Sequence, residues 1–411
     1  MEYVTGYSCT LCGKTFPKDF PHLTCPECGE TGILDIHYDY PRLRTFLTKE
    51  WFQKNKDYSM WRYHPLLSVE RTHMDRTLKV GWTPLYRSNT LAKKLGLKTL
   101  YFKDEGVNPS GSLIDRSSAV AVLKALKEGK DTVACSSTGN AASSLAGNAA
   151  KMGLKSVIFV PKRAPRGKLI QIMAYGAEVI SVQGDYKAAY ELSKKAIDHY
   201  GFYNRNAAIN PHLVEGKKTV ALELAEQLDF TLTDWVVVSV GDGCTIGGVY
   251  NGFYDLHALG LIDKIPKILG VQSEGCAPFY TAWKQGASTL EETEENTIAD
   301  SIAVGIPRNP TKGLRAVNDS YGAYITVSDD AILSAITKLG KDEGLFTEPA
   351  AAAPYAGLEE ALNTSVIKSY ESVSVILTGN GLKEPDTVKK VLKTPVKLEN
   401  DLKSLQAHLN T

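Results

Sequence analysis

The chain has 411 residues, of which 43% are hydrophobic and 23% charged, and its formal net charge at pH 7 is +1. This length and composition are typical of a globular protein with two or three domains, each with its own core. The balanced charge argues against a nucleic-acid partner, and no apolar run is long enough for a membrane span. The first residues lack the basic and apolar regions of a signal peptide, so we expect a cytoplasmic location.

Four of the seven cysteines lie within the first 28 residues, as two Cys-x2-Cys pairs that are each followed by a glycine. A glycine at this place allows the positive φ that a metal-binding turn needs. Two such pairs are typical of a closed tetrahedral zinc site, so we predict a structural Zn²⁺ ribbon. The alternatives are unligated cysteines or a redox pair, which would need only one of the two motifs. The predicted ligands are Cys9, Cys12, Cys25 and Cys28.

Further along the chain, residues 99–102 predict a strand, residues 108–111 read Asn-Pro-Ser-Gly and predict a turn, and residues 118–126 have the apolar period of a helix. The connection from a strand through a turn to the start of a helix is where α/β enzymes bind ligands. Residues 38–80 are rich in aromatic side chains and predict helices that pack on another surface.

Strand-like and helical runs alternate between residues 118 and 225, which predicts a parallel sheet with right-handed crossovers. A second group of strand-like runs follows, so we expect an α/β fold with two parallel-sheet lobes and a cleft between them. The acidic, threonine-rich residues 284–300 predict a surface insertion. The expected strands are 132–135, 156–160, 178–182, 235–240, 268–272 and 374–377, and the expected helices are 141–151, 168–175 and 186–200.

Two loops have the composition of anion sites. Ser137, Thr138 and Gly139 stand between a short strand and a helix, where hydroxyl and backbone N–H groups can hold a carboxylate. The alternative there is simple helix capping. A glycine-rich loop after the 235–240 strand lacks the Lys-Ser/Thr of a P-loop and fits a nucleotide or another phosphate. The loop residues are Gly241, Asp242, Gly243, Cys244 and Thr245.

Together these segments resemble threonine synthases, which are fold-type II pyridoxal-phosphate enzymes. The resemblance runs from the cysteine pairs to Lys383 and rests on residues 81–85 (Gly-Trp-Thr-Pro-Leu), 108–116, 136–144, 240–248, 348–352 and 377–383. It implies a tryptophan synthase β-like fold, pyridoxal 5'-phosphate in the cleft, a small-molecule amino acid substrate, a role in amino-acid biosynthesis and a homodimer. It also implies a zinc ribbon at 1–38, a large cofactor-binding lobe at 39–117 and 215–411, and a small lobe at 118–214.

The same resemblance implies roles for single residues. Residues 137–139 grip the substrate carboxylate, and Asn140 touches the phenolic oxygen of the cofactor. The loop 241–245 holds the cofactor phosphate. Thr378 meets the pyridine nitrogen and leaves the ring uncharged there, which suits eliminations and replacements.

One central residue departs from the family. Threonine synthases read Asn-Pro-Thr-Gly-Ser-x-Lys-Asp-Arg at this turn, and here Ile114 stands in the place of the lysine. That lysine binds the cofactor covalently, speeds exchange with the substrate amine and moves protons. Isoleucine has no amine and no titratable proton. By family analogy Lys103 lies before the turn and Lys124 lies well inside the helix, so neither can take the place of the family lysine.

A second departure concerns the substrate. Ala141, Ala208 and Leu213 stand where the family has a threonine, a serine and an arginine that help to bind the phosphate of O-phosphohomoserine. This favours another substrate, and cysteate synthase, a relative that acts on O-phosphoserine, is one possible template. We predict a lyase or synthase that catalyses elimination or replacement on an amino acid. The alternative is a homologue with lost or altered catalysis that acts as a ligand-binding or partner protein.

Overall fold

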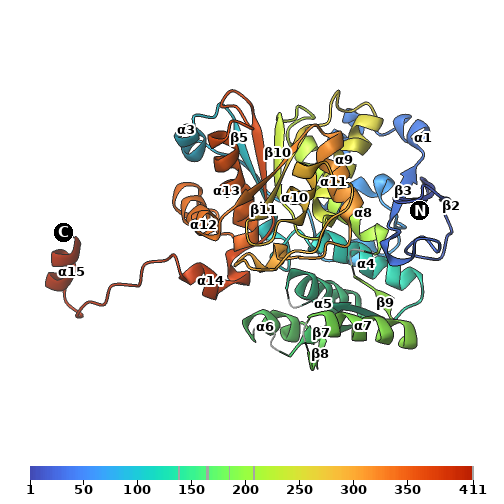
Figure 1. The fold of residues 1–411 in the computed structure, drawn as a ribbon, viewed down its shortest axis with the longest axis horizontal. Coiled ribbons are helices and arrows are strands. Elements are labelled where there is room, and N and C mark those ends of the chain that lie inside the picture. The colour runs from blue at the N-terminus through green and yellow to red at the C-terminus, as the bar shows by residue number, and fades with distance from the viewer. Residues whose placement is uncertain (138, 163–165, 185, 207–208, 410–411) are drawn as a thin grey trace.

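The computed structural model describes residues 1–411 except 138, 163–165, 185, 207–208 and 410–411. Three sheets organise these residues (Figure 1). The first is an antiparallel sheet in the order β2-β1-β3, which comes from the cysteine-rich N-terminus. Its strands are β1 (Val4–Cys9), β2 (Thr15–Pro17) and β3 (Leu34–Tyr38).

The largest sheet has six strands in the order β12-β11-β10-β13-β5-β4. Five of them are parallel, and the edge strand β4 runs antiparallel to β5. The predicted strands β5, β10, β11 and β13 are confirmed, whereas β12 and the antiparallel edge strand were not predicted. The bounds are β4 (Leu85–Arg87), β5 (Leu100–Asp104), β10 (Trp235–Ser239), β11 (Lys267–Ser273), β12 (Ala323–Val327) and β13 (Val373–Leu377).

Helices lie on both faces of this sheet, because its central strands are apolar and buried on both sides. The helices that precede the third sheet in the chain are α1 (Tyr40–Arg44), α2 (Lys49–Lys54), α3 (Thr90–Leu95) and α4 (Asp115–Lys127). The C-terminal half contributes α8 (Pro211–Gln227), α9 (Cys244–Ala258), α10 (Pro278–Gln285), α11 (Pro310–Asp319), α12 (Asp329–Glu343), α13 (Pro349–Asn363) and α14 (Pro385–Lys389). The last helix, α15 (Leu402–Leu409), stands apart from the body in Figure 1.

The third sheet is parallel and has the order β8-β7-β6-β9. Its strands are β6 (Thr132–Ser136), β7 (Lys155–Pro161), β8 (Glu178–Val182) and β9 (Tyr203–Asn204), and its helices are α5 (Asn140–Met152), α6 (Arg166–Ala174) and α7 (Tyr186–Tyr200). The predicted alternation of strands and helices is confirmed here. The lobe boundaries at residues 118 and 214 stay a prediction.

Helix α8 packs against both α4 and α9, and glycines allow the close approach. A Cβ atom on Gly216 would stand 2.3 Å from the Arg116 carbonyl oxygen, and one on Gly252 would stand 2.5 Å from the Lys218 carbonyl oxygen. Any side chain at these positions would push the helices apart. These contacts therefore fix the rotation of α8 relative to its two neighbours.

The N-terminal sheet docks on α11 through Asp35. Arg315 donates two hydrogen bonds to this carboxylate, at 2.6 and 2.9 Å, and the buried Lys312 lies 3.1 Å from it. Lys312 also donates to the Leu34 carbonyl oxygen at 2.7 Å. Burial opposes ionisation of Asp35, but the two cations hold the pKa of this carboxyl well below its usual range.

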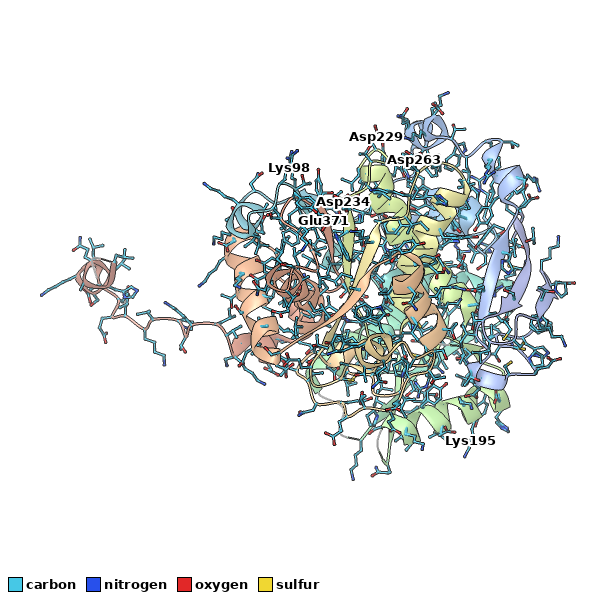
Figure 2. All side chains as sticks on the ribbon, turned by 45° about the horizontal axis from the view of Figure 1, so that its top comes forward. Lys98, Lys195, Asp229, Asp234, Asp263 and Glu371 are labelled. Atoms are coloured by element: carbon cyan, nitrogen blue, oxygen red, sulfur yellow. The ribbon has the colours of Figure 1, made fainter. Side chains whose placement is uncertain are left out.

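Figure 2 shows the side chains of the molecule and labels charged residues at its outside. Asp234, Asp263, Glu371 and Lys98 precede β10, β11, β13 and β5, so they lie at the amino ends of the large-sheet strands. Among the described residues, every helix is too short or too polar to cross a membrane.

A buried ion network joins the end of β5 and the start of α4 to α8. Arg116 donates to both oxygens of Glu105 at 2.7 Å and to Glu223 at 3.0 Å, and all three side chains are fully buried. Lys103 also pairs with Glu223. The backbone N–H groups of Trp82 and Thr83 donate to the same carboxylate at 2.6 Å, so the Gly-Trp-Thr-Pro-Leu segment is held against α8.

Glu223→Gln should destabilise the protein by about 3–5 kcal/mol, because it leaves the buried Lys103 and Arg116 charges uncompensated. Burial raises the pKa of Glu223, but Arg116 and Lys103 hold it at about 2. Because the unfolded value is about 4.3, this stability should be fully present above that pH and be lost as the pH falls towards 2. Urea denaturation measures the effect, with Asp342→Asn as the control, because the exposed Lys94–Asp342 pair should contribute only about 0–1 kcal/mol. Equal effects of the two substitutions would contradict the prediction.

Candidate active site

Most of the residues predicted to bind the cofactor or the substrate line one cleft of about 460 Å³. The cleft lies at the carboxyl ends of β5, β6, β7, β10 and β13, where α/β proteins bind ligands. The structure brings together Ile114, Ser137, Gly139, Asn140, Gly241, Asp242, Gly243, Cys244, Thr245 and Thr378. Thr138 and Ala208 lie outside the described residues.

The turn that carries Ile114 is held against the segment after β13. The Leu113 N–H donates to the Thr378 carbonyl oxygen at 2.9 Å, and the Asn380 N–H donates to the Gly111 carbonyl oxygen at 3.0 Å. Ile114 follows directly as the residue before α4 and presents a half-buried hydrocarbon side chain to the cleft. The structure therefore places Ile114 beside Thr378, at the junction of two strand ends.

Asn140 begins α5, and its amide is fixed by a partner that stands directly before α13. The Nδ2 group donates to the Glu348 carboxylate at 2.7 Å and lies 3.4 Å from Ser301 Oγ. Glu348 is buried, stands directly before α13 and also lines the cleft. This contact joins the small-sheet side of the cleft to the large-sheet side.

The glycine-rich loop leads into α9. Gly243 has φ of 87° and caps the helix, and a Cβ atom there would stand 2.5 Å from the Asn309 carbonyl oxygen. The Asp242 carboxylate accepts from the Arg308 N–H at 3.1 Å, which holds the loop against the start of α11. The first N–H groups of α9 have no partner within the helix, and the positive end of its dipole favours an anion at this place.

Several cleft residues were not predicted from the sequence. Arg205, which follows β9, and Lys217, which lies within α8, are buried cations. The guanidinium group of Arg308 stacks over the Tyr190 ring at 4.0 Å. Arg205 begins the segment that contains Ala208 and Leu213, but its place in the cleft, like that of Lys217 and Arg308, depends on how the elements pack. The prediction that residues 284–300 form a surface insertion was incomplete, because Glu295 and Asp300 from this segment line the cleft.

The other predicted residues lie as follows. Lys103 donates to the Thr83 carbonyl oxygen at 2.6 Å and lies away from the cleft lining, as does Lys124. Cys135 and Cys244 are buried in the cleft wall, and burial raises the pKa of the Cys135 thiol to about 11. Leu213 packs in the core instead of lining the cleft.

The four N-terminal cysteines form one cluster. Their sulfur atoms all lie within 4.8 Å of one another, and the Sγ atoms of Cys12 and Cys25 are 3.8 Å apart. A tetrahedral ion with Zn–S bonds of about 2.3 Å requires sulfur atoms roughly 3.8 Å apart. Gly13 and Gly29 have the positive φ that the sequence predicts. The cluster therefore has the dimensions of a four-thiolate metal site.

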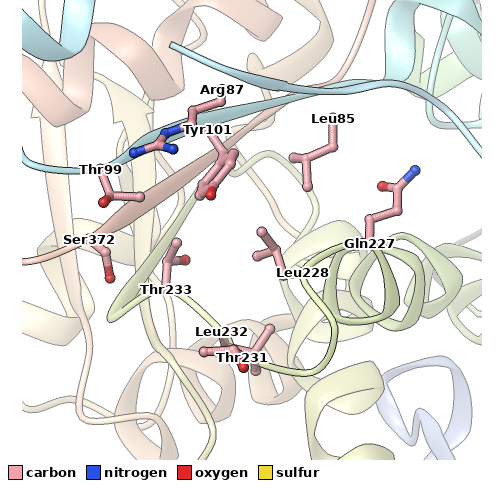
Figure 3. Close-up of a pocket in the computed structure, with 10 residues that line it drawn as sticks. All are labelled: Leu85, Arg87, Thr99, Tyr101, Gln227, Leu228, Thr231, Leu232, Thr233 and Ser372. Atoms are coloured by element: carbon pink, nitrogen blue, oxygen red, sulfur yellow. The ribbon is translucent and has the colours of Figure 1, made fainter. Parts of the chain in front are cut away.

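A second cavity, of about 580 Å³, lies at the amino ends of the large-sheet strands (Figure 3). It is open to the surface and is lined by Leu85, Arg87, Thr99, Tyr101, Gln227, Leu228, Thr231, Leu232, Thr233 and Ser372. None of the predicted functional residues lies there. The amino ends of parallel strands are also the edge at which α/β folds rarely bind substrates.

Comparison with known proteins places the chain in a family. A sequence model of the family described as "Pyridoxal-phosphate dependent enzyme" matches residues 76–379. The threonine synthase of Methanosarcina acetivorans is 39% identical over 400 residues, which cover 97% of each chain. The threonine synthase of Methanocaldococcus jannaschii is 38% identical over 400 residues, 97% of this chain and 98% of that protein.

The fold agrees with this result. The structure of diaminopropionate ammonia lyase from Escherichia coli superposes with a TM-score of 0.66 at 19% identity, over 82% of this chain and 93% of that one. A likeness at this identity shows a shared fold only. Together with the sequence matches along nearly the whole chain, these observations show that the chain belongs to the threonine synthase family of fold-type II pyridoxal-phosphate-dependent enzymes.

Proposed function

We propose that this threonine synthase-like lyase binds pyridoxal phosphate in the cleft and catalyses an elimination or replacement on an amino acid in amino-acid biosynthesis. The observation that carries the proposal is that the candidate residues from separate segments converge on one cleft at the strand ends. Pyridoxal phosphate supplies an electron sink next to the amino group of a bound substrate.

The residues of the cleft fit this cofactor except at one position. The first turn of α9 and Thr245 would hold the phosphate, and the Thr378 hydroxyl would meet the ring nitrogen. Asn140, fixed by Glu348, would contact the phenolic oxygen. The hydroxyl and N–H groups at the start of α5, Ser137 among them, would orient the substrate carboxylate.

Ile114 is the position that does not fit covalent binding, because its side chain has no amine. We therefore propose that the cofactor binds noncovalently and that residue 114 neither gives nor takes a proton during the reaction. A chain with lost or altered catalysis is the alternative, and the Ile114 substitution described below separates the two.

The cysteine cluster supports a structural zinc site, since four sulfur atoms at tetrahedral spacing leave no open coordination position. We propose that Zn²⁺ fixes the N-terminal sheet, whose Asp35 docks on α11 next to the glycine-rich loop. The homodimer and the cytoplasmic location stay predictions.

The purified protein should contain about one equivalent of zinc, because a closed four-thiolate site binds the metal tightly. Cys25→Ser should remove the metal and lower the melting temperature, whereas Cys276→Ser, a buried cysteine outside the cluster, should keep it. Elemental analysis and thermal melting measure both effects. A native protein without zinc, whose four N-terminal thiols all react with an alkylating reagent, would contradict the proposal.

Ile114→Lys should create a covalent link to the cofactor and raise turnover by about 10²–10⁴-fold, the scale of a restored acid–base group. Borohydride reduction followed by peptide mass analysis detects the link at residue 114. Ile114→Met is the matched control, because it has a similar length and no amine. A lysine variant without attached cofactor, or a wild-type protein that is fully active without any cofactor, would refute the proposed role of this position.

The substrate proposal can be tested at Ala141, which lines the cleft at the start of α5. Because alanine offers no donor to a substrate phosphate, Ala141→Thr should tighten O-phosphohomoserine binding by about tenfold, the value of one hydrogen bond to a charged group. Homoserine, which lacks the phosphate, should bind both proteins equally. Calorimetry measures both affinities, and tight binding of O-phosphohomoserine to the wild-type protein would show that other residues hold its phosphate.

A further inference from the structure

Helix α8 carries two neighbouring buried lysines with different surroundings. Lys218 pairs with Glu215 and with Asp255, the latter at 2.7 Å, so its charge is matched by carboxylates. Lys217 points to the other side and lines the cleft, with 5% of its surface exposed. Consecutive helical residues project about 100° apart, so one lysine serves the core and the other faces the cleft.

The ammonium group of Lys217 has a neutral partner. Its Nζ atom donates to the Thr245 hydroxyl at 3.3 Å. Within the described part of the chain, no carboxylate lies at ion-pair distance from it, and the nearby Asp242 carboxylate accepts from the Arg308 N–H. Burial lowers the pKa of Lys217, and this effect outweighs the opposing influence of Cys244 and Asp242, while the Arg205 charge adds to the lowering. The charged lysine is therefore costly in the protein alone.

The start of α9 adds a second positive potential at the same place. Thr245 lies in the first turn of this 15-residue helix, where the N–H groups and the dipole favour an anion. A lysine ammonium beside this end of the helix is unfavourable, since both are positive. A doubly negative group between them would offset both costs through charge-assisted hydrogen bonds.

We propose that Lys217 is the cation that binds the phosphate group of a phosphomonoester cofactor, together with Thr245 and the first turn of α9. The inference rests on the proposed function, in which that cofactor is pyridoxal phosphate. Because Ile114 cannot hold the cofactor covalently, the ion pair with Lys217 supplies the main anchor. Lys217 is thus a positioning residue for the cofactor and takes no part in proton transfer.

The test compares the wild-type protein with Lys217→Gln, using pyridoxal phosphate and pyridoxal as probes in a fluorescence titration. The substitution should weaken pyridoxal phosphate binding by about 10- to 100-fold and leave pyridoxal binding unchanged within about twofold. Lys124→Gln is the matched control. Lys124 is also buried and has a pKa lowered by burial, but it lies outside the cleft lining, so its loss should change neither affinity.

Thermal melting provides a second readout and separates the two proposals. Without ligand, the melting temperature of Lys217→Gln should be no lower than that of the wild type, because the substitution removes an uncompensated buried charge. Inorganic phosphate should raise the melting temperature of the wild type and leave that of Lys217→Gln unchanged. The inference would be overturned if the wild type and Lys217→Gln bound pyridoxal phosphate with equal affinity, or if the substitution weakened pyridoxal binding as much as pyridoxal phosphate binding. A cofactor link to Lys217 that borohydride reduces would also overturn it. If the wild type binds inorganic phosphate through Lys217 but binds no pyridoxal phosphate, the proposed function fails and the anion site stands. Binding of neither ligand by the wild type would overturn both.

Discussion

The buried ion network around Arg116 is the constraint on which the rest of the cleft depends. It joins Lys103 of β5 and Glu105, which follows this strand, to Glu223 of α8. Arg116 is also the second residue of α4, so the network sets where that helix begins. Since the turn and α8 both contribute residues to the cleft lining, one set of ion pairs positions both residue 114 and Lys217.

This arrangement explains how a cleft can stay intact around a missing lysine. The hydrogen bonds that shape the turn come from its backbone and from Asp115, whose carboxylate accepts from the Ser110 N–H at 2.7 Å and from Ser144 at 2.8 Å. None of them involves the side chain of residue 114. An isoleucine there removes an amine from the cleft without removing any support from the walls. Loss of covalent chemistry and loss of fold are therefore separable in this chain.

The elements that could be predicted from the sequence are those whose residue pattern lies within one short segment. Strands such as β10 and β13 are continuous apolar runs because they are buried on both faces, and the cysteine pairs fix their own geometry through spacing. The edge strand β4 has three residues and pairs antiparallel, so it leaves no such run. Lys217 could not be separated from Lys218 along the sequence, because the choice depends on the rotation of α8, which the contacts of Gly216 with α4 decide.

The central claim is that this cleft holds pyridoxal phosphate without a covalent bond. Equilibrium dialysis of the wild-type protein, followed by absorbance spectroscopy before and after borohydride treatment, tests it most directly. We expect about one cofactor per chain, with the spectrum of the free aldehyde, and all of it should be released when the reduced protein is denatured. No binding at saturating cofactor, or cofactor that stays attached to the denatured chain after reduction, would contradict it.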